Sequence, residues 1–358
     1  MNRRSFSNGA LSLVSSLLFS KEGHAQADQG LWVPPEEDPH ELTFMQWPVN
    51  KTVHPDSQFL TILQQTIADI ANAISEFEPV TLLMAEEYTK AARKLLSDKV
   101  EIWDIPTEDL WARDSGPLFA RKTDGSLVVS HIQFNGWGEK QVHKLDGTIA
   151  SQIADRLGVE MISSGLKGEA GGVEHDGHGL LAAHESSWFN DNRNRGMSRD
   201  EVEARLLAAY GAKRMIWTKG VYGEDITDYH IDSLARFTGP GRILINLPDD
   251  PDLDDPFHVA AIDTYDKLVE EGLEVEVISE PSKRRIKSFD FVASYANYYV
   301  CDGAVIAAQF GDRETDQAAT AALKRHYPDR EIVTLNVDAL GEVGGGIHCA
   351  TQQMPKAG

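Results

Sequence analysis

The sequence predicts an α/β fold in a single domain, and three observations support this prediction. Segments with helical and with strand periodicity alternate along most of the chain. No Pro/Ser-rich linker or low-complexity stretch interrupts them. The composition, with 41% hydrophobic and 25% charged residues over 358 positions, is that of a globular protein long enough to bury a sizeable core.

Helices are predicted where apolar residues recur at helical spacing. The pattern is clearest over 57–77 and 198–210, and the second segment begins with Ser198 and Glu201 at the spacing of a capping box. Further helices are expected at 87–97, 148–157, 256–271 and 313–327.

Short β-branched or alternating runs between the helices predict strands, and 297–301 also has the composition of a buried strand. We find no sequence repeat, but the chain has room for about five units of strand, helix and strand. Periodicity alone therefore leaves α/β and α+β architectures open. The other predicted strands are 100–105, 126–134, 179–183, 242–247, 274–278, 303–307 and 331–337.

The first 27 residues have the pattern of a twin-arginine export signal. Arg3 and Arg4 precede a weakly apolar run, and Ala25-Gln26-Ala27 offers small residues at a cleavage site. The run is about ten residues long, whereas a membrane-spanning helix needs roughly twenty. We expect 1–27 to be removed, 28–358 to be the mature domain, the location to be the periplasm, and no membrane span.

The formal net charge of −22 constrains the partners. An acidic surface repels nucleic acid and anionic lipid and attracts small cations, although much of this charge serves solubility. We expect no nucleic-acid partner, and the oligomeric state stays open, a homo-oligomer included.

The two cysteines are expected to be free thiols, although an exported protein can form disulfides. Cys301 lies in the predicted buried strand, where a thiol is usually a small hydrophobic side chain. Cys349 follows three glycines and a histidine in GGGIHCATQQMP, 344–355. Glycines allow a bound ligand to come close to the backbone, and a neighbouring histidine can activate a thiol. Cys349 is therefore a candidate nucleophile.

The segment EDITDYHID, 224–232, contains a candidate acid and base. If it forms an extended strand, His230 and Asp232 face the same side and enter one site. A histidine among carboxylates can exchange a proton near neutral pH. The alternative is an acidic loop with a solvated histidine.

Two further segments place carboxylates among glycines. WARDSGP, 111–117, contains Asp114, and GEAGGVEHDGHG, 168–179, contains Glu169 and Asp176. Carboxylates pair bidentately with a planar guanidinium group and balance its charge. Trp111 is a candidate for a flat wall against such a ligand.

The sequence supports neither of two possible metal sites. The spacing of His175, His178 and His184 matches no established zinc pattern. An aspartate run that resembles the start of a calcium loop lacks the required glycine and glutamate, so we interpret it as a solvated loop. This run contains Asp250, Asp252 and Asp254.

Together these segments resemble the agmatine deiminase family, which includes the Porphyromonas-type peptidylarginine deiminases. The resemblance covers nearly the whole mature chain. It implies a pentein fold, a five-bladed pseudo-symmetric α/β propeller with a central active site, and no metal or organic cofactor. Besides the segments above it includes VPPEEDPHELTFMQWP (33–48), FNGWGEK (134–140), WFNDNRNRGMSRDEVE (188–203) and SYANYYVCDGAVIAAQFGD (294–312).

The resemblance also implies roles for individual residues. Cys349 matches the nucleophile and His230 the general acid and base. Asp114 and Glu169 match the carboxylates that hold the guanidinium, and Asp232 is a further acidic partner. The implied reaction forms a covalent thiouronium intermediate and releases ammonia. With agmatine as substrate, the second product is N-carbamoylputrescine.

Three positions depart from the family pattern: Tyr229 and Ala170 replace glycines, and Gly346 replaces an asparagine. We expect each to alter the pocket near the reacting carbon. The alternative substrate is a peptide with a C-terminal arginine, which a basic residue placed to pair with its carboxylate would favour. A non-catalytic guanidino-binding protein is a third hypothesis. A cysteine protease is disfavoured, because carboxylates would repel its oxyanion.

Overall fold

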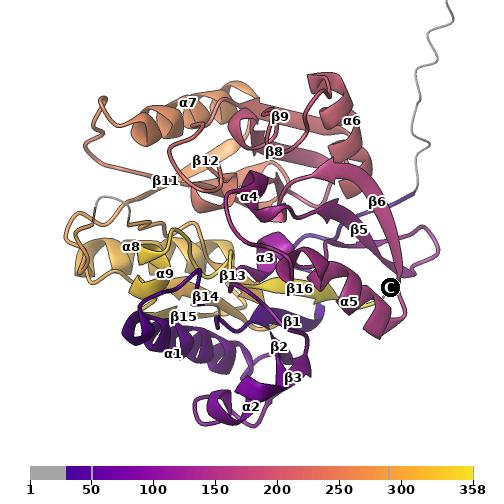
Figure 1. The fold of residues 1–358 in the computed structure, drawn as a ribbon. Coiled ribbons are helices and arrows are strands. Elements are labelled where there is room, and N and C mark those ends of the chain that lie inside the picture. The colour runs from indigo at the N-terminus through magenta and orange to yellow at the C-terminus, as the bar shows by residue number, and fades with distance from the viewer. Residues whose placement is uncertain (1–29, 50, 289–290, 358) are drawn as a thin grey trace, which may run out of the picture.

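The computed structural model describes residues 30–49, 51–288 and 291–357, and the predicted export signal lies outside these ranges. The predicted α/β class is confirmed (Figure 1). Five small sheets are arranged around a common centre with their helices on the outside, which also confirms the five-bladed propeller expected from the resemblance.

Each sheet begins with an antiparallel pair and continues with a parallel strand. In the second sheet β4 (Phe119–Arg121) pairs antiparallel with β5 (Leu127–Gln133), which pairs parallel with β6 (Glu160–Lys167). A helix connects the two parallel strands, as a parallel connection requires. The same order holds in the next three sheets, which contain β7 (Glu174–His175), β8 (Leu180–His184) and β9 (Arg214–Thr218); β10 (Ala235–Gly239), β11 (Arg242–Leu247) and β12 (Glu274–Ser279); and β13 (Tyr299–Cys301), β14 (Ala304–Ala308) and β15 (Glu331–Leu335).

The first sheet closes the ring. Its strands β1 (His40–Gln46), β2 (Val80–Met84) and β3 (Val100–Asp104) are parallel neighbours. The C-terminal strand β16 (Gln352–Pro355) pairs antiparallel with β1, so the two ends of the described chain are joined in one sheet. This pairing brings the segment before β16 to the centre of the molecule (Figure 1).

The outer helices bury one face against the sheets. In α1 (Ser57–Ile74), Asp56 caps the N-terminus by accepting from the N–H groups of Gln58 and Phe59, and Leu63, Ile67 and Ile70 are fully buried. The predicted capping box of Ser198 and Glu201 is confirmed at the start of α6. The other helices are α2 (Glu86–Ala92), α3 (Ala112–Ser115), α4 (Gly136–Glu139), α5 (Ile149–Leu157), α6 (Arg199–Tyr210), α7 (Pro256–Glu270), α8 (Arg313–His326) and α9 (Asp338–Glu342).

The helices and strands that periodicity predicted are present, with ends shifted by a few residues, and the buried strand expected at 297–301 is β13. Several other strands were not predicted. Among them, β4 and β7 have three and two residues, which is too short for a strand period to appear. No helix of the described segments is long and apolar enough to cross a membrane.

Two glycines give a test of the packing. Gly158 and Gly211 end α5 and α6 in the same left-handed conformation, with φ of 67°. A Cβ atom at 158 would meet nothing within 4 Å, whereas one at 211 would lie 1.7 Å from the Leu31 carbonyl oxygen. We expect Gly158→Ala to cost about 1 kcal/mol of unfolding free energy and Gly211→Ala at least roughly 3 kcal/mol, measured by urea denaturation. Equal losses would contradict the close contact with Leu31.

Candidate active site

The candidate site is built from five loops at the centre of the ring. Each loop leads into the strand that opens one of the sheets. Asp114 precedes β4, Glu169 precedes β7, His230 precedes β10 and Cys349 precedes β16. The loop before β13 completes the set. Residues far apart in the sequence therefore meet because the sheets repeat around one axis.

Cys349 lies beside two polar side chains. It is half-buried, and its Sγ is 3.2 Å from Nδ2 of Asn297 and 3.5 Å from Oδ2 of Asp232. Cys301 is buried in β13, and both thiols are free, as predicted. Burial raises the pKa of the Cys349 thiol well above its usual value, and the charges of Asp232 and Asp114 raise it further. Without a ligand this thiol is therefore protonated at neutral pH.

The prediction that His230 and Asp232 lie on a strand is wrong. Residues Ile231–Ser233 form a 3₁₀ turn, and the Asp225 and Thr227 side chains accept the backbone N–H groups of Tyr229 and His230. These local hydrogen bonds replace a strand ladder. His230 and Asp232 nevertheless enter one site.

Gly171 marks the point where three of the site groups converge. A Cβ atom added there would lie 2.7 Å from Asp114 Oδ1, 2.9 Å from His230 Nδ1 and 3.2 Å from Asp232 Oδ2. Any side chain at this position would fill the space between Asp114, His230 and Asp232. The glycine is therefore required by the site itself.

Asp232 is held by the histidine that precedes the nucleophile. Its Oδ2 lies 2.7 Å from Nδ1 of His348, whose Nε2 lies 3.1 Å from Glu36. Burial opposes the charge on Asp232, but the hydrogen bond with His348 and the charges of His348, His230 and Arg236 together outweigh it and lower the pKa. The buried Oδ1 of Asp232 has no hydrogen-bond partner among the described residues. Since an unpaired buried carboxylate oxygen is costly, this atom is available for a ligand N–H.

Asp114 is oriented by a tryptophan. Its Oδ2 accepts a hydrogen bond of 2.8 Å from Nε1 of Trp137, and its Oδ1 accepts one from the Gly171 N–H and lies 3.7 Å from Nδ1 of His230. Burial raises the pKa of Asp114 to about 6, although His230 opposes the increase.

Trp137 reaches Asp114 from an unusual backbone turn. Gly136, Trp137, Gly138 and Glu139 all have positive φ, between 54° and 82°. A left-handed conformation at Trp137 and Glu139 costs free energy, so the surrounding contacts must stabilise it. Asn135 does so by accepting the Gly138 N–H with its side chain.

Glu169 is paired on both sides. Its Oε2 lies 2.9 Å from Nε of the buried Arg193 and 3.3 Å from Nε2 of His230. Arg193 also contacts Asp228 at 2.6 Å. Burial opposes the charge on Glu169, but Arg193 and His230 outweigh it and lower the pKa.

His230 thus lies between two carboxylates. Burial disfavours its charge, but Asp114 and Glu169 outweigh this effect and raise the pKa of the imidazole to about 9. His230 therefore carries a proton at neutral pH and is ready to donate it.

Trp111 is placed next to the nucleophile. A Cβ atom at Gly345 would lie 2.5 Å from the Trp111 ring and 3.4 Å from Cβ of Cys349. The ring is 8% exposed, so it forms part of a wall rather than a surface contact. Its role as a wall against a bound ligand stays a prediction.

The departures from the family pattern act differently from what we expected. The Tyr229 ring stacks on His184 and packs against Phe257, so its side chain is not part of the site. Its φ of 67° is nevertheless one that glycine adopts most easily. Ala170 lines a separate cavity of about 30 Å³.

The positions weighed for metals are dispersed. Across the three described ranges no group of three His, Cys, Asp or Glu side chains is arranged to hold a metal ion. His184 hydrogen-bonds to the Tyr229 carbonyl, and His178 to that of Asp176. Asp252 and Asp254 lie in an exposed loop before α7, as expected.

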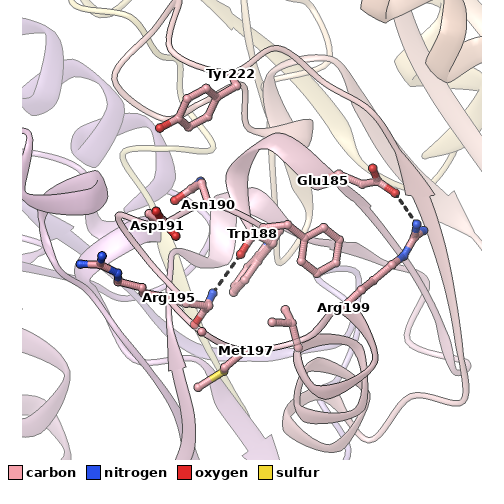
Figure 2. Close-up of a pocket in the computed structure, with 12 residues that line it drawn as sticks. Glu185, Trp188, Asn190, Asp191, Arg195, Met197, Arg199 and Tyr222 are labelled. Carbon is pink, nitrogen blue, oxygen red and sulfur yellow. Dashed lines mark hydrogen bonds and ion pairs between the residues drawn. The ribbon is translucent and has the colours of Figure 1, made fainter.

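A larger hollow of about 510 Å³ lies apart from the thiol, and none of the predicted site residues lines it. Figure 2 shows Trp188 in its centre and Arg199 paired with Glu185 at one side. The Trp188 ring also packs against Gly168, and its Nε1 donates to the Gly172 carbonyl beside the site.

Several residues of the site were not predicted. Trp137, Arg193 and Asn297 lie in segments that carry the family resemblance, but nothing in their spacing indicated a role. His348 was noted only as a neighbour of the cysteine. A buried arginine or asparagine in a polar loop would have indicated a role in the site. Burial cannot be predicted from the sequence of such irregular segments, so these residues could not be identified in advance.

Comparisons with known proteins identify the family. A family model for Porphyromonas-type peptidyl-arginine deiminase matches residues 32–355. The agmatine deiminase of Medicago truncatula is 30% identical over 367 residues, with 91% of this chain and 96% of that protein covered. A Streptomyces coelicolor protein provisionally named agmatine deiminase is 33% identical over 340 residues, with coverage of 90% and 98%. The structure of Enterococcus faecalis agmatine deiminase superposes with a TM-score of 0.83 at 26% identity, with coverage of 92% and 96%.

Proposed function

Because the chain belongs to the Porphyromonas-type peptidyl-arginine deiminase family, we propose that it hydrolyses agmatine to N-carbamoylputrescine and ammonia. One observation carries the proposal. A protonated histidine, His230, and the carboxylates of Asp114 and Asp232 converge at Gly171. A third buried carboxylate, Glu169, lies 3.3 Å from His230, and the Cys349 thiol lies 3.5 Å from Asp232. This is a nucleophile, an acid and a counter-charge for a guanidinium cation.

The substrate binds through its charge and its planar shape. The carboxylates of Asp114 and Glu169 and the unpaired Oδ1 of Asp232 accept its N–H groups. The bound cation also balances the two carboxylates that oppose ionisation of Cys349, so substrate binding favours the thiolate, and the thiol proton is released to solvent.

The reaction then has two steps. The Cys349 thiolate forms a C–S bond to the guanidinium carbon, a C–N bond breaks, and His230 supplies the proton with which ammonia leaves. In the second step, water gives a proton to His230 and attacks the thiouronium carbon. The C–S bond breaks and the ureido product leaves.

A comparison of three substrates tests the proposal. The purified protein is incubated with agmatine, free arginine and a peptide that ends in arginine, and ammonia and ureido product are measured. We expect agmatine to be turned over with the highest kcat/KM. A preference for the peptide would assign the enzyme to peptidyl arginine instead. No product from any of the three would favour a guanidino-binding protein.

The expected pH dependence of kcat/KM follows from the raised pKa values of Asp114 and His230. Asp114 has a pKa of about 6 and must be ionised to bind a cation, so kcat/KM falls as the pH drops through about 6. His230 has a pKa of about 9 and must hold its proton, so kcat/KM falls again above about 9. A pH profile of kcat/KM for agmatine checks both limbs. A constant value down to pH 5 would contradict the role of Asp114.

We also infer that the protein is exported to the periplasm by its first 27 residues. The paired arginines, the short apolar run and the Ala25-Gln26-Ala27 site support this inference. A periplasmic enzyme would meet external agmatine or peptides. The full chain expressed in a bacterium with a twin-arginine pathway should reach the periplasm and be shortened. Replacing Arg3 and Arg4 with lysine should retain it in the cytoplasm, and unchanged export would contradict the prediction.

A further inference from the structure

The fifth central loop carries a side chain that touches the sulfur. The four loops before β4, β7, β10 and β16 supply the groups discussed above. The loop before β13 supplies Asn297, which is 2% exposed. Its position in the repeated architecture is therefore equivalent to that of the acid, base and nucleophile.

Asn297 is tied to the nucleophile and to the neighbouring carboxylate. Its Nδ2 lies 3.2 Å from Sγ of Cys349 and 3.2 Å from the Asp232 carbonyl oxygen. Its Oδ1 accepts the Cys349 N–H at 3.4 Å, and its own carbonyl accepts the His348 N–H at 3.3 Å. The Asn297 amide thus contacts both the side-chain sulfur and the backbone N–H of Cys349.

These partners fix the orientation of the amide. The Cys349 N–H can only donate, so it requires Oδ1, and the Asp232 carbonyl can only accept, so it requires Nδ2. One hydrogen on Nδ2 serves the carbonyl. The second is the hydrogen that faces the sulfur.

Gly346 leaves the space for this contact. A Cβ atom at 346 would lie 2.4 Å from Oδ1 of Asn297 and 2.8 Å from its Cγ. The asparagine amide therefore occupies the position that any side chain at 346 would need. Among the departures from the family pattern, this one bears directly on the reacting atom.

We propose that Asn297 is a catalytic residue, whose amide N–H donates to the Cys349 sulfur and stabilises the attacking thiolate. This inference rests on the proposed function for the identity of the reaction. Asp114 and Asp232 disfavour ionisation of the thiol, and these two carboxylates are in turn contacted by His230 and His348. The N–H of Asn297 opposes the effect of the two carboxylates at close range.

The test compares Asn297→Ala with Asn297→Asp. Alanine removes the donor, whereas aspartate keeps the shape, removes the donor and adds a negative charge. The rate of Cys349 alkylation by iodoacetamide is measured against pH for the wild type and both variants. We expect the midpoint to move up by about one to two pH units in Asn297→Ala and further in Asn297→Asp. For agmatine, kcat should fall roughly tenfold to a hundredfold while KM changes little.

Two controls make the result specific. Cys349→Ser measures the background alkylation. This background should be low, because the other cysteine, Cys301, is 1% exposed. Ser294→Ala changes the same loop at a side chain whose Oγ accepts the Ala296 N–H. If Asn297→Ala does not fold, the alkylation profile of the isosteric Asn297→Asp variant still tests the role of the amide.

An alkylation midpoint in Asn297→Asp equal to that of the wild type would overturn the proposal, since the amide would then only fill space. The alkylation profile does not require turnover. A wild type that leaves agmatine intact would refute the proposed function, and the midpoint shift would still decide the role of Asn297.

Discussion

Replacing Cys349 with serine is expected to lower agmatine turnover by roughly a thousandfold or more. A serine hydroxyl is far less acidic than a thiol, and the carboxylates around position 349 further oppose an anion. The structure shows no histidine hydrogen-bonded to Sγ that could activate a hydroxyl within the described residues. The rate of ureido product formation measures the loss.

Cys301→Ser is the matched control. Cys301 is buried in β13, and its thiol donates to the Ala304 carbonyl, away from the candidate site. This variant should keep the kcat of the folded protein, although replacing the buried thiol with a hydroxyl costs some stability. Comparable kcat values for Cys349→Ser and the wild type would exclude Cys349 as the nucleophile.

The sequence identified the candidate residues, but it could not predict that they lie close together in the fold. Periodicity placed the helices, and the glycine-rich segments pointed to Cys349 and the carboxylates. The distances between them depend on which strands are neighbours. The pairing of β1 with β16 joins residues more than three hundred positions apart, and no local pattern encodes it. The resemblance to a family supplied this information.

Local polar bonds explain why the strand at His230 was predicted wrongly. Alternating side chains in DITDYHID fit a strand, but Asp225 and Thr227 bond to the backbone of their own segment. Asp228 and Tyr229 then adopt φ of 60° and 67°, which no strand allows. Such strain occurs at functional sites because surrounding contacts stabilise it. Two of those contacts are the bonds of Asp228 to Lys140 and Arg193.

Arg193 shows how the unpredicted residues support the predicted ones. Its side chain is fully buried and joins two loops, contacting Glu169 at 2.9 Å, Asp228 at 2.6 Å and the Thr227 carbonyl at 2.9 Å. Thr227 and Asp228 lie just before His230. Arg193 therefore positions the carboxylate and the histidine relative to each other.

Arg193→Met is expected to destabilise the protein by about 3–5 kcal/mol and to lower kcat/KM strongly, because the buried carboxylates of Glu169 and Asp228 each lose one of their two cationic partners. Urea denaturation measures the first effect and agmatine turnover the second. Arg195→Met is the matched control, since Arg195 is exposed and should change neither quantity. Arg193→Met/Glu169→Gln should recover part of the stability without recovering activity, because it removes one unpaired charge together with a ligand for the substrate. Unchanged stability in Arg193→Met would contradict the buried ion pairs on which this account of the site depends.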